Sequence, residues 1–229
     1  MNSPQQLLLD LKPPTPPTLG NYVTGANQEL LARLRTIATD ARAIYLWGPS
    51  GCGKTHLLRA IGAAPNARYL HAAAIHTAMD AELDLVADSL LAIDDIQALN
   101  PAAQIAVFRT INDARALKLT LLLSGDQPPL HLQLREDLRT RIGQMLIYEV
   151  RALSDDEKCA ALQRHAQERG MTLDIALTQY LLRHGRRDLP SLMSVLDALD
   201  QASLQQKRQP TLPLLRELLQ PVLELGNSP

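Results

Sequence analysis

The stretch "GPSGCGKT", which begins at Gly48, places glycines, a lysine and a threonine at the spacing G-x-x-x-x-G-K-T. Gly48, Gly51 and Gly53 let backbone N–H groups turn inward and approach phosphate oxygens. A helix that begins near Lys54 directs its positive end at the same oxygens. Lys54 supplies a charge for the β- and γ-phosphates, and Thr55 supplies a hydroxyl for Mg²⁺. The stretch therefore predicts a nucleotide phosphate site, and a chance glycine-rich turn is the weaker alternative.

A pair of aspartates follows an apolar run further along the chain, in "DSLLAIDDIQAL". A phosphate loop needs a metal-holding acid at the end of a neighbouring strand, and Asp94 is placed to hold Mg²⁺ through water. Asp95 would then lie near the water that attacks the γ-phosphate. An aspartate is one methylene shorter than the glutamate of many hydrolytic ATPases, so strong independent hydrolysis is not expected. The alternative is a charged strand end that faces solvent.

The elements that must position these residues alternate between two periodicities. Buried-strand patterns occur at residues 43–47, 67–71, 89–93, 119–124 and 145–150, and helical patterns occur at 27–39, 54–62, 101–116 and 134–141. Strands that alternate with helices predict an α/β domain with a parallel sheet covered on both faces. The ligand is expected at the carboxyl ends of the strands.

After residue 151 the pattern becomes purely helical. Four helices are predicted, at about 154–170, 173–185, 188–207 and 212–219. Ser154 and Glu157 form a capping box at the start of the first, and Gly170 ends it. We therefore expect three parts, namely an N-terminal tail with a proline-rich linker at 1–20, an α/β nucleotide-binding domain at 21–151 and a small all-α lid domain at 152–229.

Composition excludes several classes of protein. The chain has 229 residues, 46% of them apolar, and a net charge of -1, which is no electrostatic footprint for strong nucleic-acid binding. It has no apolar run of the ~18 residues that a membrane span needs and no signal peptide, so a cytoplasmic location is expected. Two cysteines far apart in the sequence give neither a disulfide framework nor a metal cluster.

Several stretches resemble the DnaA initiator family of AAA+ ATPases and occur in the same order. The similar stretches are "NYVTGANQELL", "GPSGCGKTHLL", "LLAIDDIQAL", "LLLSGDQPP" and "DLRTRIGQML". The resemblance extends from about Asn21 to Leu219. It implies an AAA+ P-loop domain with a parallel sheet, followed by a small all-α lid, and ADP or ATP with Mg²⁺ as the bound cofactor.

The resemblance also implies roles for individual residues. Nucleotide contacts are implied for Tyr22, Val23, Gly48, Gly51, Cys52, Gly53, Lys54, Thr55, His56, Asp94, Asp126 and Arg187, and Mg²⁺ contacts for Thr55 and Asp94. Asp126 matches the polar sensor after the fourth strand, although capping of the following turn explains it equally well. Arg187 matches the sensor arginine of the lid, although Arg186 is adjacent. Catalytic roles fall to Asp95 and to Arg141, which matches the arginine finger that acts on a neighbour's nucleotide.

The N-terminal segment departs from the initiators. Where they carry a long N-terminal region and a C-terminal DNA-reading domain, this chain has a short tail and ends at Pro229, a layout that resembles the regulatory inactivators of the family. "QLLLDL" is similar to the peptide by which many proteins dock on the bacterial DNA polymerase β sliding clamp. Clamp contacts are implied for Gln6, Leu7, Leu9 and Leu11, and "KPPTPPT" would act as a semi-rigid spacer. A disordered tail or an extra strand on the domain is the alternative.

These resemblances lead us to expect a regulatory protein. It would dock on the sliding clamp and lend Arg141 to ATP-bound DnaA, whose hydrolysis of ATP prevents re-initiation of chromosome replication. It would contact DNA only indirectly and could form a homodimer. The first alternative is a self-sufficient AAA+ ATPase of the helicase-loader or clamp-loader type, and the second is a small-molecule kinase, for which the chain offers no acceptor motif.

Overall fold

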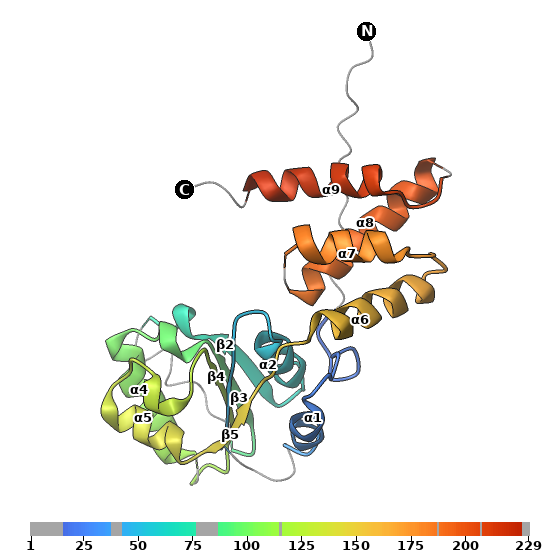
Figure 1. Ribbon diagram of the computed structural model, residues 1–229. Helices are drawn as coiled ribbons and strands as arrows, with labels where there is room; N and C mark the ends of the chain where they lie inside the picture. The colour runs from blue at the N-terminus through green and yellow to red at the C-terminus, as the bar shows by residue number, and fades with distance from the viewer. Residues whose placement is uncertain are drawn as a thin grey trace. The chain divides into compact units, whose positions relative to one another are not determined.

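The computed structural model describes residues 16–37, 43–76, 87–114, 116–186, 188–206 and 208–225, with side chains up to residue 219. The described residues form two compact units, one spanning Pro16–Ala152 and one that contains the chain from Leu153 onward (Figure 1). The two units have separate hydrophobic cores.

The first unit is built on a sheet of five described strands. They are β1 (Ala43–Trp47), β2 (Ala67–His71), β3 (Leu90–Asp94), β4 (Thr120–Gly125) and β5 (Leu146–Glu149). The strands lie in the order β2-β3-β4-β1-β5, and each neighbouring pair is parallel. Every residue of β3 and β4 is buried, as strands covered on both faces require. Since all strands run the same way, their carboxyl ends meet at one end of the sheet.

Helices cover both faces of the sheet because alternate strand residues point to opposite sides. Ile44 and Leu46 of β1 pack in a cluster with α1 (Gln28–Arg35) and α2 (Lys54–Gly62). Tyr45, which lies between them, packs in the other cluster with α4 (Pro101–Asp113) and α5 (Glu136–Gly143). Short 3₁₀ turns follow β2, β3 and β4, namely η1 (Ala72–Ala74), η2 (Ile96–Ala98) and η3 (Pro129–His131).

The second unit is helical throughout its described residues. Its helices are α6 (Asp155–Glu168), α7 (Ile175–His184), α8 (Leu189–Gln206) and α9 (Leu212–Leu225), packed around a leucine-rich core. The capping box predicted at the start of α6 is present, because Ser154 accepts from the N–H of Glu157 and the Glu157 carboxylate accepts from the N–H of Ser154. The parallel sheet covered by helices and the helical second unit agree with the predicted fold class.

Each predicted strand lies within one residue of its observed bounds, but some helix ends were wrong. The helix predicted at 134–141 begins at Glu136, because Arg135 is held in an extended conformation by its N–H bond to the Gln104 side chain. The helix predicted at 101–116 ends at Asp113, before a turn in which Lys118 has a positive φ. The helix predicted at 27–39 ends at Arg35, since the chain then turns to bury Ile37.

The last helix shows the largest difference from its prediction. It continues to Leu225 instead of ending near Leu219, so its backbone passes through Pro221. A proline inside a helix removes one backbone hydrogen bond, and this helix tolerates that loss. Within the described residues, no helix combines the length and apolar character that crossing a bilayer would need.

Candidate nucleotide-binding site

The loop between β1 and α2 depends on glycine at three positions. Gly51 and Gly53 have φ angles of 78° and 100°, which L side chains rarely adopt. A Cβ atom on Gly53 would also lie 2.8 Å from the Tyr22 ring, and one on Gly48 would collide with the carbonyl oxygen of Val150. Glycines with such φ angles allow loop N–H groups to turn toward a phosphate.

Lys54 is the first residue of α2 and its side chain is buried inside the loop. It is 7% exposed, and its Nζ donates to the carbonyl oxygens of Gly48 at 2.7 Å and Pro49 at 3.1 Å. A buried charge requires such partners. The ammonium therefore lies at the start of the helix, where the helix dipole and the lysine charge both favour an anion. Half-buried Thr55 follows it in the first turn of the same helix.

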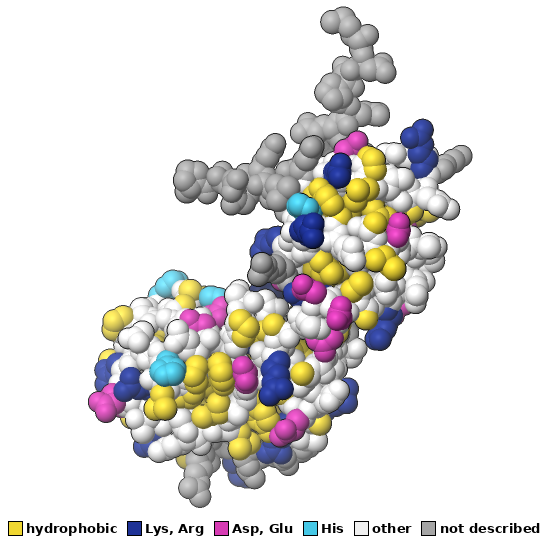
Figure 2. Space-filling view, in the orientation of Figure 1, with side chains coloured by type: hydrophobic (Ala, Val, Ile, Leu, Met, Phe, Trp, Pro, Cys, Tyr) yellow, Lys and Arg dark blue, Asp and Glu magenta, His cyan; other side chains and the backbone are white. Residues whose placement is uncertain are grey.

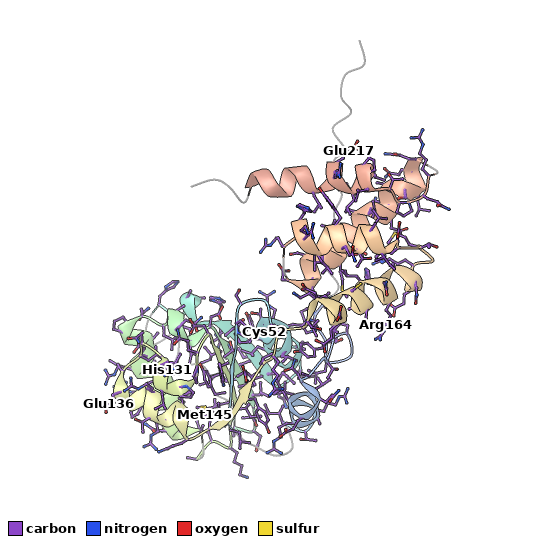
Figure 3. The ribbon with its side chains drawn as sticks, viewed as in Figure 1. Cys52, His131, Glu136, Met145, Arg164 and Glu217 are labelled. Carbon is purple, nitrogen blue, oxygen red and sulfur yellow. The ribbon has the colours of Figure 1, made fainter. Side chains whose placement is uncertain are left out.

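Cys52 lies in the same loop (Figure 3) and is buried, with its Sγ 3.8 Å from Lys54 Nζ. Burial raises the pKa of the Cys52 thiol, against the opposing effect of the Lys54 charge. A neutral thiol is a small apolar filler beside the lysine. This environment agrees with a small residue that fills space in the loop.

The segment before α1 packs against the loop. The rings of Tyr22 and His56 have centroids 5.5 Å apart, and His56 Nε2 lies 2.9 Å from the carbonyl oxygen of Thr18. Burial raises the pKa of the Tyr22 phenol to about 12, so the phenol stays neutral over the physiological range. Val23 is half-buried beside it. Tyr22 and His56, which belong to two stretches far apart in the sequence, are thus neighbours in the fold.

Asn27 was missed by the sequence analysis, although it holds this segment in place. It is 4% exposed, and its side-chain amide donates to Tyr22 and to the carbonyl oxygen of Arg151, while its side-chain oxygen accepts from the Arg151 N–H. Asn27 therefore connects the start of the first unit to its end. An asparagine just before an apolar helix reads as a helix cap, so the sequence offered no signal for this contact.

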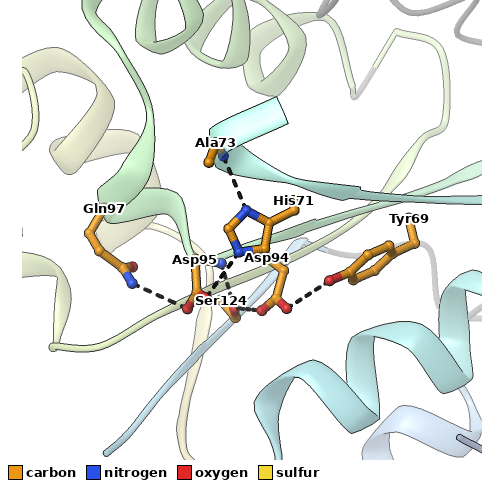
Figure 4. Close-up of polar contacts among 7 residues, drawn as sticks. All are labelled: Tyr69, His71, Ala73, Asp94, Asp95, Gln97 and Ser124. Carbon is orange, nitrogen blue, oxygen red and sulfur yellow. Dashed lines mark hydrogen bonds and ion pairs between the residues drawn. The ribbon is translucent and has the colours of Figure 1, made fainter. Parts of the chain in front are cut away.

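Asp94 ends β3 and is completely buried (Figure 4). One carboxylate oxygen accepts from the hydroxyl of Ser124, and the other accepts from the Tyr69 hydroxyl at 2.9 Å. Burial, opposed by neighbouring Arg59 and assisted by Asp94, raises the pKa of the Tyr69 phenol, which keeps it a donor. The two hydroxyls fix the direction of the carboxylate.

Asp95 follows in a left-handed conformation, with φ of 56°. Its N–H donates to Ser124 Oγ at 3.0 Å, and its Oδ1 accepts from Gln97 Nε2 at 3.2 Å. Its Oδ2 lies 3.3 Å from Nε2 of His71, whose side chain is 44% exposed. The two aspartates therefore point their carboxylates at different partners (Figure 4).

The register of the sheet brings these side chains together. His71 of β2 pairs with Asp94 of β3, and Ile93 pairs with Leu123 of β4, so Ser124 follows at the same end of the sheet. Ser124, Tyr69, His71 and Gln97 were not predicted as site residues. Strand order brings Ser124, Tyr69 and His71 to the aspartates, whereas Gln97 lies two residues after Asp95 in the chain.

The residues at this end of the sheet fit a nucleotide with Mg²⁺. Lys54 and the helix start suit phosphate oxygens, and Asp94 offers the carboxylate oxygens that Mg²⁺ prefers. The described residues contain no cluster of three His, Cys, Asp or Glu side chains that could hold a metal alone.

Asp126 lies just beyond the end of β4 and is exposed. The adjacent Gln127 is fixed, because the Tyr45 hydroxyl donates to its carbonyl oxygen at 2.6 Å. Burial raises the pKa of the Tyr45 phenol, and Asp126 adds to the rise. Asp126 thus lies at the same end of the sheet as Asp94, next to a residue whose carbonyl oxygen is hydrogen-bonded.

Arg141 lies at a different place, in the last turn of α5, and is exposed. Among the described residues, its guanidinium makes one long hydrogen bond of 3.4 Å to Gln144 Oε1. Arg135 contrasts with it, because two of its nitrogens contact the Asp137 carboxylate at 3.1 and 2.7 Å. Both arginines line a surface depression of about 790 Å³ that also includes Phe108.

Some predicted residues fall outside the described part of the chain. These are the clamp-contact residues Gln6, Leu7, Leu9 and Leu11 and the lid residue Arg187. The neighbouring Arg186 is described, and its Nε lies 3.3 Å from Asp188 Oδ2.

Comparison with protein families identifies both units. The bacterial DnaA ATPase domain family matches residues 16–149, which is more than half of the chain. The family described as the lid domain of Hda matches residues 155–219. The two matches follow one another in the order of the two units.

Similar solved structures agree on the fold. Domain III of the replication initiation protein DnaA from Thermotoga maritima is 20% identical, with a TM-score of 0.69 over 91% of this chain and 98% of that one. The RuvB Holliday junction branch migration motor from the same organism is 19% identical, with a TM-score of 0.68 over 89% and 71%. DnaA from Aquifex aeolicus, solved with bound AMPPCP, is 20% identical, with a TM-score of 0.68 over 82% and 66%.

Proposed function

The chain belongs to the bacterial DnaA ATPase domain family and carries a lid of the Hda type, and from this premise we propose that it stimulates hydrolysis of ATP bound to DnaA. The two family matches show a DnaA-related regulatory AAA+ protein. We assign the regulatory act to Arg141, which would work on the nucleotide of a partner. DnaA then loses its ATP and cannot initiate replication again.

The exposed guanidinium of Arg141 carries this proposal. An arginine finger must project from its own subunit and stabilise charge on a neighbour's transferring phosphate. Arg141 is exposed and has one long contact, whereas Arg135, just before the same helix, is occupied by Asp137. A helix turn that presents an uncommitted guanidinium beside a surface depression suits insertion into another AAA+ domain.

The chain's own nucleotide has a structural part in this proposal. ADP or ATP, with Mg²⁺, would bind through Lys54 and Thr55 at the start of α2 and through Asp94 at the end of β3. Asp126 would sense the nucleotide from the first unit and Arg187 from the lid. A nucleotide that stabilises the folded chain by binding to it does not require turnover.

The N-terminal tail would supply the second attachment. Leu7, Leu9 and Leu11 would bind an apolar groove of the DNA polymerase β sliding clamp, and Gln6 would bond to backbone groups at its rim. Each buried leucine contributes ~1.5–3 kcal/mol before ordering costs, so one peptide binds modestly. Two sites on a ring-shaped clamp would raise the affinity by avidity. The tail therefore concentrates the protein near replicated DNA.

Direct DNA binding is not part of the proposal. Basic and acidic side chains are interspersed on the visible face of the molecule (Figure 2), and the net charge is -1. A cytoplasmic location follows from the replication role. The same AAA+ face that meets DnaA could also pair two copies of this chain.

The test is hydrolysis of radiolabelled ATP already bound to DnaA, in the presence of clamp and DNA. Wild type is expected to accelerate it, and Arg141→Ala is expected to lose at least about 10³-fold of the stimulation, the lower end of what arginine fingers contribute. Leu9→Ala should lower the stimulation that depends on docking to the clamp. It should leave unchanged any stimulation that does not need the clamp. Arg139→Ala, two residues away on the same helix, is the matched control and should retain most of the stimulation.

A self-sufficient ATPase remains the second candidate, because one chain holds both the phosphate loop and the acidic pair. ATP turnover by the purified protein without a partner separates the two. If wild type leaves DnaA-bound ATP untouched on loaded clamp, yet hydrolyses free ATP rapidly, the regulatory proposal is wrong and the second candidate replaces it.

A further inference from the structure

The start of α5 is held by a side chain from another helix. Arg135, the N-cap residue of α5, has non-helical backbone angles, and its own side chain makes no capping bond. The Arg135 N–H donates instead to Oε1 of Gln104 in α4, at 2.9 Å. The first N–H groups of a helix have no partner within that helix, so a contact from outside helps to decide where α5 begins.

The amide of Gln104 has a second partner in the chain. Gln104 is 9% exposed, and its Nε2 donates to the carbonyl oxygen of Leu99 at 3.0 Å. Leu99 and Asp95 flank the η2 turn, so Leu99 lies where the chain leaves the acidic pair. One buried amide therefore connects the turn after Asp95 to the start of the helix that carries Arg141.

Apolar packing and this hydrogen bond restrain α5 in different ways. Leu138 and Ile142 of α5 are completely buried and belong to one hydrophobic cluster with Ala103 and Val107 of α4, the neighbouring helix in Figure 1. The hydrophobic effect holds the two helices together but has no direction. A hydrogen bond weakens steeply when its angle or length changes, so the bond to Gln104 restrains α5 along its axis.

The position of Arg141 depends on that of the whole helix. α5 has 8 residues, and a helix this short moves as one piece, so a shift of its start displaces its last turn as well. Arg141 is exposed and has no packing of its own that would correct such a shift. A catalytic group that is misplaced by about 1 Å can lose ~10²-fold in rate.

We propose that Gln104 is a positioning residue for the arginine finger, a role that rests on the proposed action of Arg141 on DnaA-bound ATP. Its amide holds the start of α5 against the turn after Asp95, and this contact places Arg141 for insertion into the partner. Because Gln104 is buried, it acts through the backbone of α5 and not by touching DnaA.

The experiment measures hydrolysis of radiolabelled ATP bound to DnaA, with clamp and DNA, over a range of concentrations of the full chain. Gln104→Leu removes both hydrogen bonds at similar volume. The maximal rate is expected to fall at least about tenfold, because the finger is misplaced in the assembled pair. The concentration for half-maximal stimulation should stay within about twofold of wild type, since the exposed surface is unchanged. A variant that was merely less folded would shift that concentration and keep the maximal rate.

Three further variants make the assay specific. Gln104→Asn keeps a buried amide that is too short to reach both partners, so it should show the same loss, and it decides the question if Gln104→Leu does not fold. Gln104→Glu keeps an acceptor of the same length for the Arg135 N–H and should restore most of the maximal rate. Thr110→Val changes another buried polar side chain of α4 and is the control, expected to keep the wild-type rate.

Hydrogen exchange followed by NMR reports on the contact itself. The amide proton of Arg135 should exchange faster in Gln104→Leu and Gln104→Asn than in wild type, and at nearly the wild-type rate in Gln104→Glu. The affinity for a fluorescent ADP analogue should stay within about twofold of wild type in all three variants, since Lys54 and Asp94 are left in place.

The outcomes distinguish the role of Gln104 from the proposed function. If Arg141→Ala abolishes stimulation but Gln104→Leu and Gln104→Asn keep the full maximal rate, Gln104 does not position the finger and the regulatory function stands. The same conclusion follows if only the half-maximal concentration shifts, or if Gln104→Glu is as impaired as Gln104→Leu. Failure of wild type to stimulate hydrolysis of DnaA-bound ATP would overturn the regulatory function itself, and the role of Gln104 with it.

Discussion

The nucleotide site and the end of α5 hold their charged side chains in opposite ways. Lys54 and Asp94 are buried, and their polar atoms are bonded to groups of the same chain. Arg141 is exposed and has one long contact. Buried, hydrogen-bonded charges suit a ligand that remains bound, whereas an exposed charge suits a partner that binds and dissociates.

This difference separates the expected effects of substitutions. Changes among the buried residues should alter nucleotide affinity and the stability of the fold together, since the same hydrogen bonds serve both. Changes at the end of α5 should alter action on DnaA and leave the folded chain intact. A variant at the end of α5 that also lowered nucleotide affinity or the stability of the fold would contradict this separation.

The largest effect inside the nucleotide site is expected from Lys54→Ala. It removes a charge that would contact phosphate oxygens, and charge-assisted hydrogen bonds of this kind are worth about 3 kcal/mol, or roughly 100-fold in affinity. Titration with a fluorescent ADP analogue measures it. Arg68→Ala, which removes an exposed cation from β2 of the same unit, is the control and should bind normally.

Lys54→Ala also tests the comparison between the two regions in the assay of DnaA-bound ATP hydrolysis. If the chain's own nucleotide is needed for the regulatory act, Lys54→Ala should stimulate DnaA poorly despite an intact Arg141, and a large excess of nucleotide should restore part of the stimulation. Normal nucleotide binding by Lys54→Ala would show that the loop does not hold phosphates as its geometry implies.

Sequence reasoning found those parts of the site that are contiguous in the chain. The phosphate loop was predicted because a strand, a turn and a helix follow one another within about twenty residues, and the acidic pair because it directly follows an apolar run. The partners of the aspartates were missed, because Tyr69 and His71 come from β2 and Ser124 comes from β4, and only the strand order brings them together. Periodicity gives strands and helices but not their neighbours.

Helix ends illustrate the same limit. The start of α6 was predicted from Ser154 and Glu157, which are three residues apart. The start of α5 was placed too early, because Arg135 is held by Gln104, which is 31 residues away. Local signals were therefore sufficient where the stabilising contact is local, and insufficient where a distant side chain decides.

A smaller effect is expected from Ser124→Ala, because Ser124 lies between the two aspartates and contacts both. The Asp94 carboxylate loses one donor and the Asp95 N–H loses its acceptor. An unsatisfied buried polar group costs about 1–3 kcal/mol, so the free energy of unfolding should fall by about 2 kcal/mol. Urea denaturation monitored by circular dichroism measures this change.

The lid offers a matched serine for comparison. Ser203 is also buried, but its hydroxyl donates to the Leu199 carbonyl one helical turn away. Such back-bonding contributes little to helix stability, so Ser203→Ala should change the free energy of unfolding by less than about 1 kcal/mol. An equal loss in the free energy of unfolding for the two variants would mean that the bonds of Ser124 to the acidic pair contribute no more to stability than back-bonding in a helix.

The smallest effect is expected from Gln144→Ala at the end of α5. Gln144 Oε1 is the partner of the Arg141 guanidinium at 3.4 Å, a distance at which a hydrogen bond is weak. If Arg141 works by projecting into DnaA, this contact only biases its orientation, and stimulation should change by less than about twofold. The folded chain should be as stable as wild type, because both side chains are exposed. Stimulation of DnaA-bound ATP hydrolysis and urea denaturation, measured on the same preparations, test both statements. A loss as large as that of Arg141→Ala would mean that Gln144 locks the arginine in place, and the end of α5 would then be preorganised in the same way as the buried acidic pair.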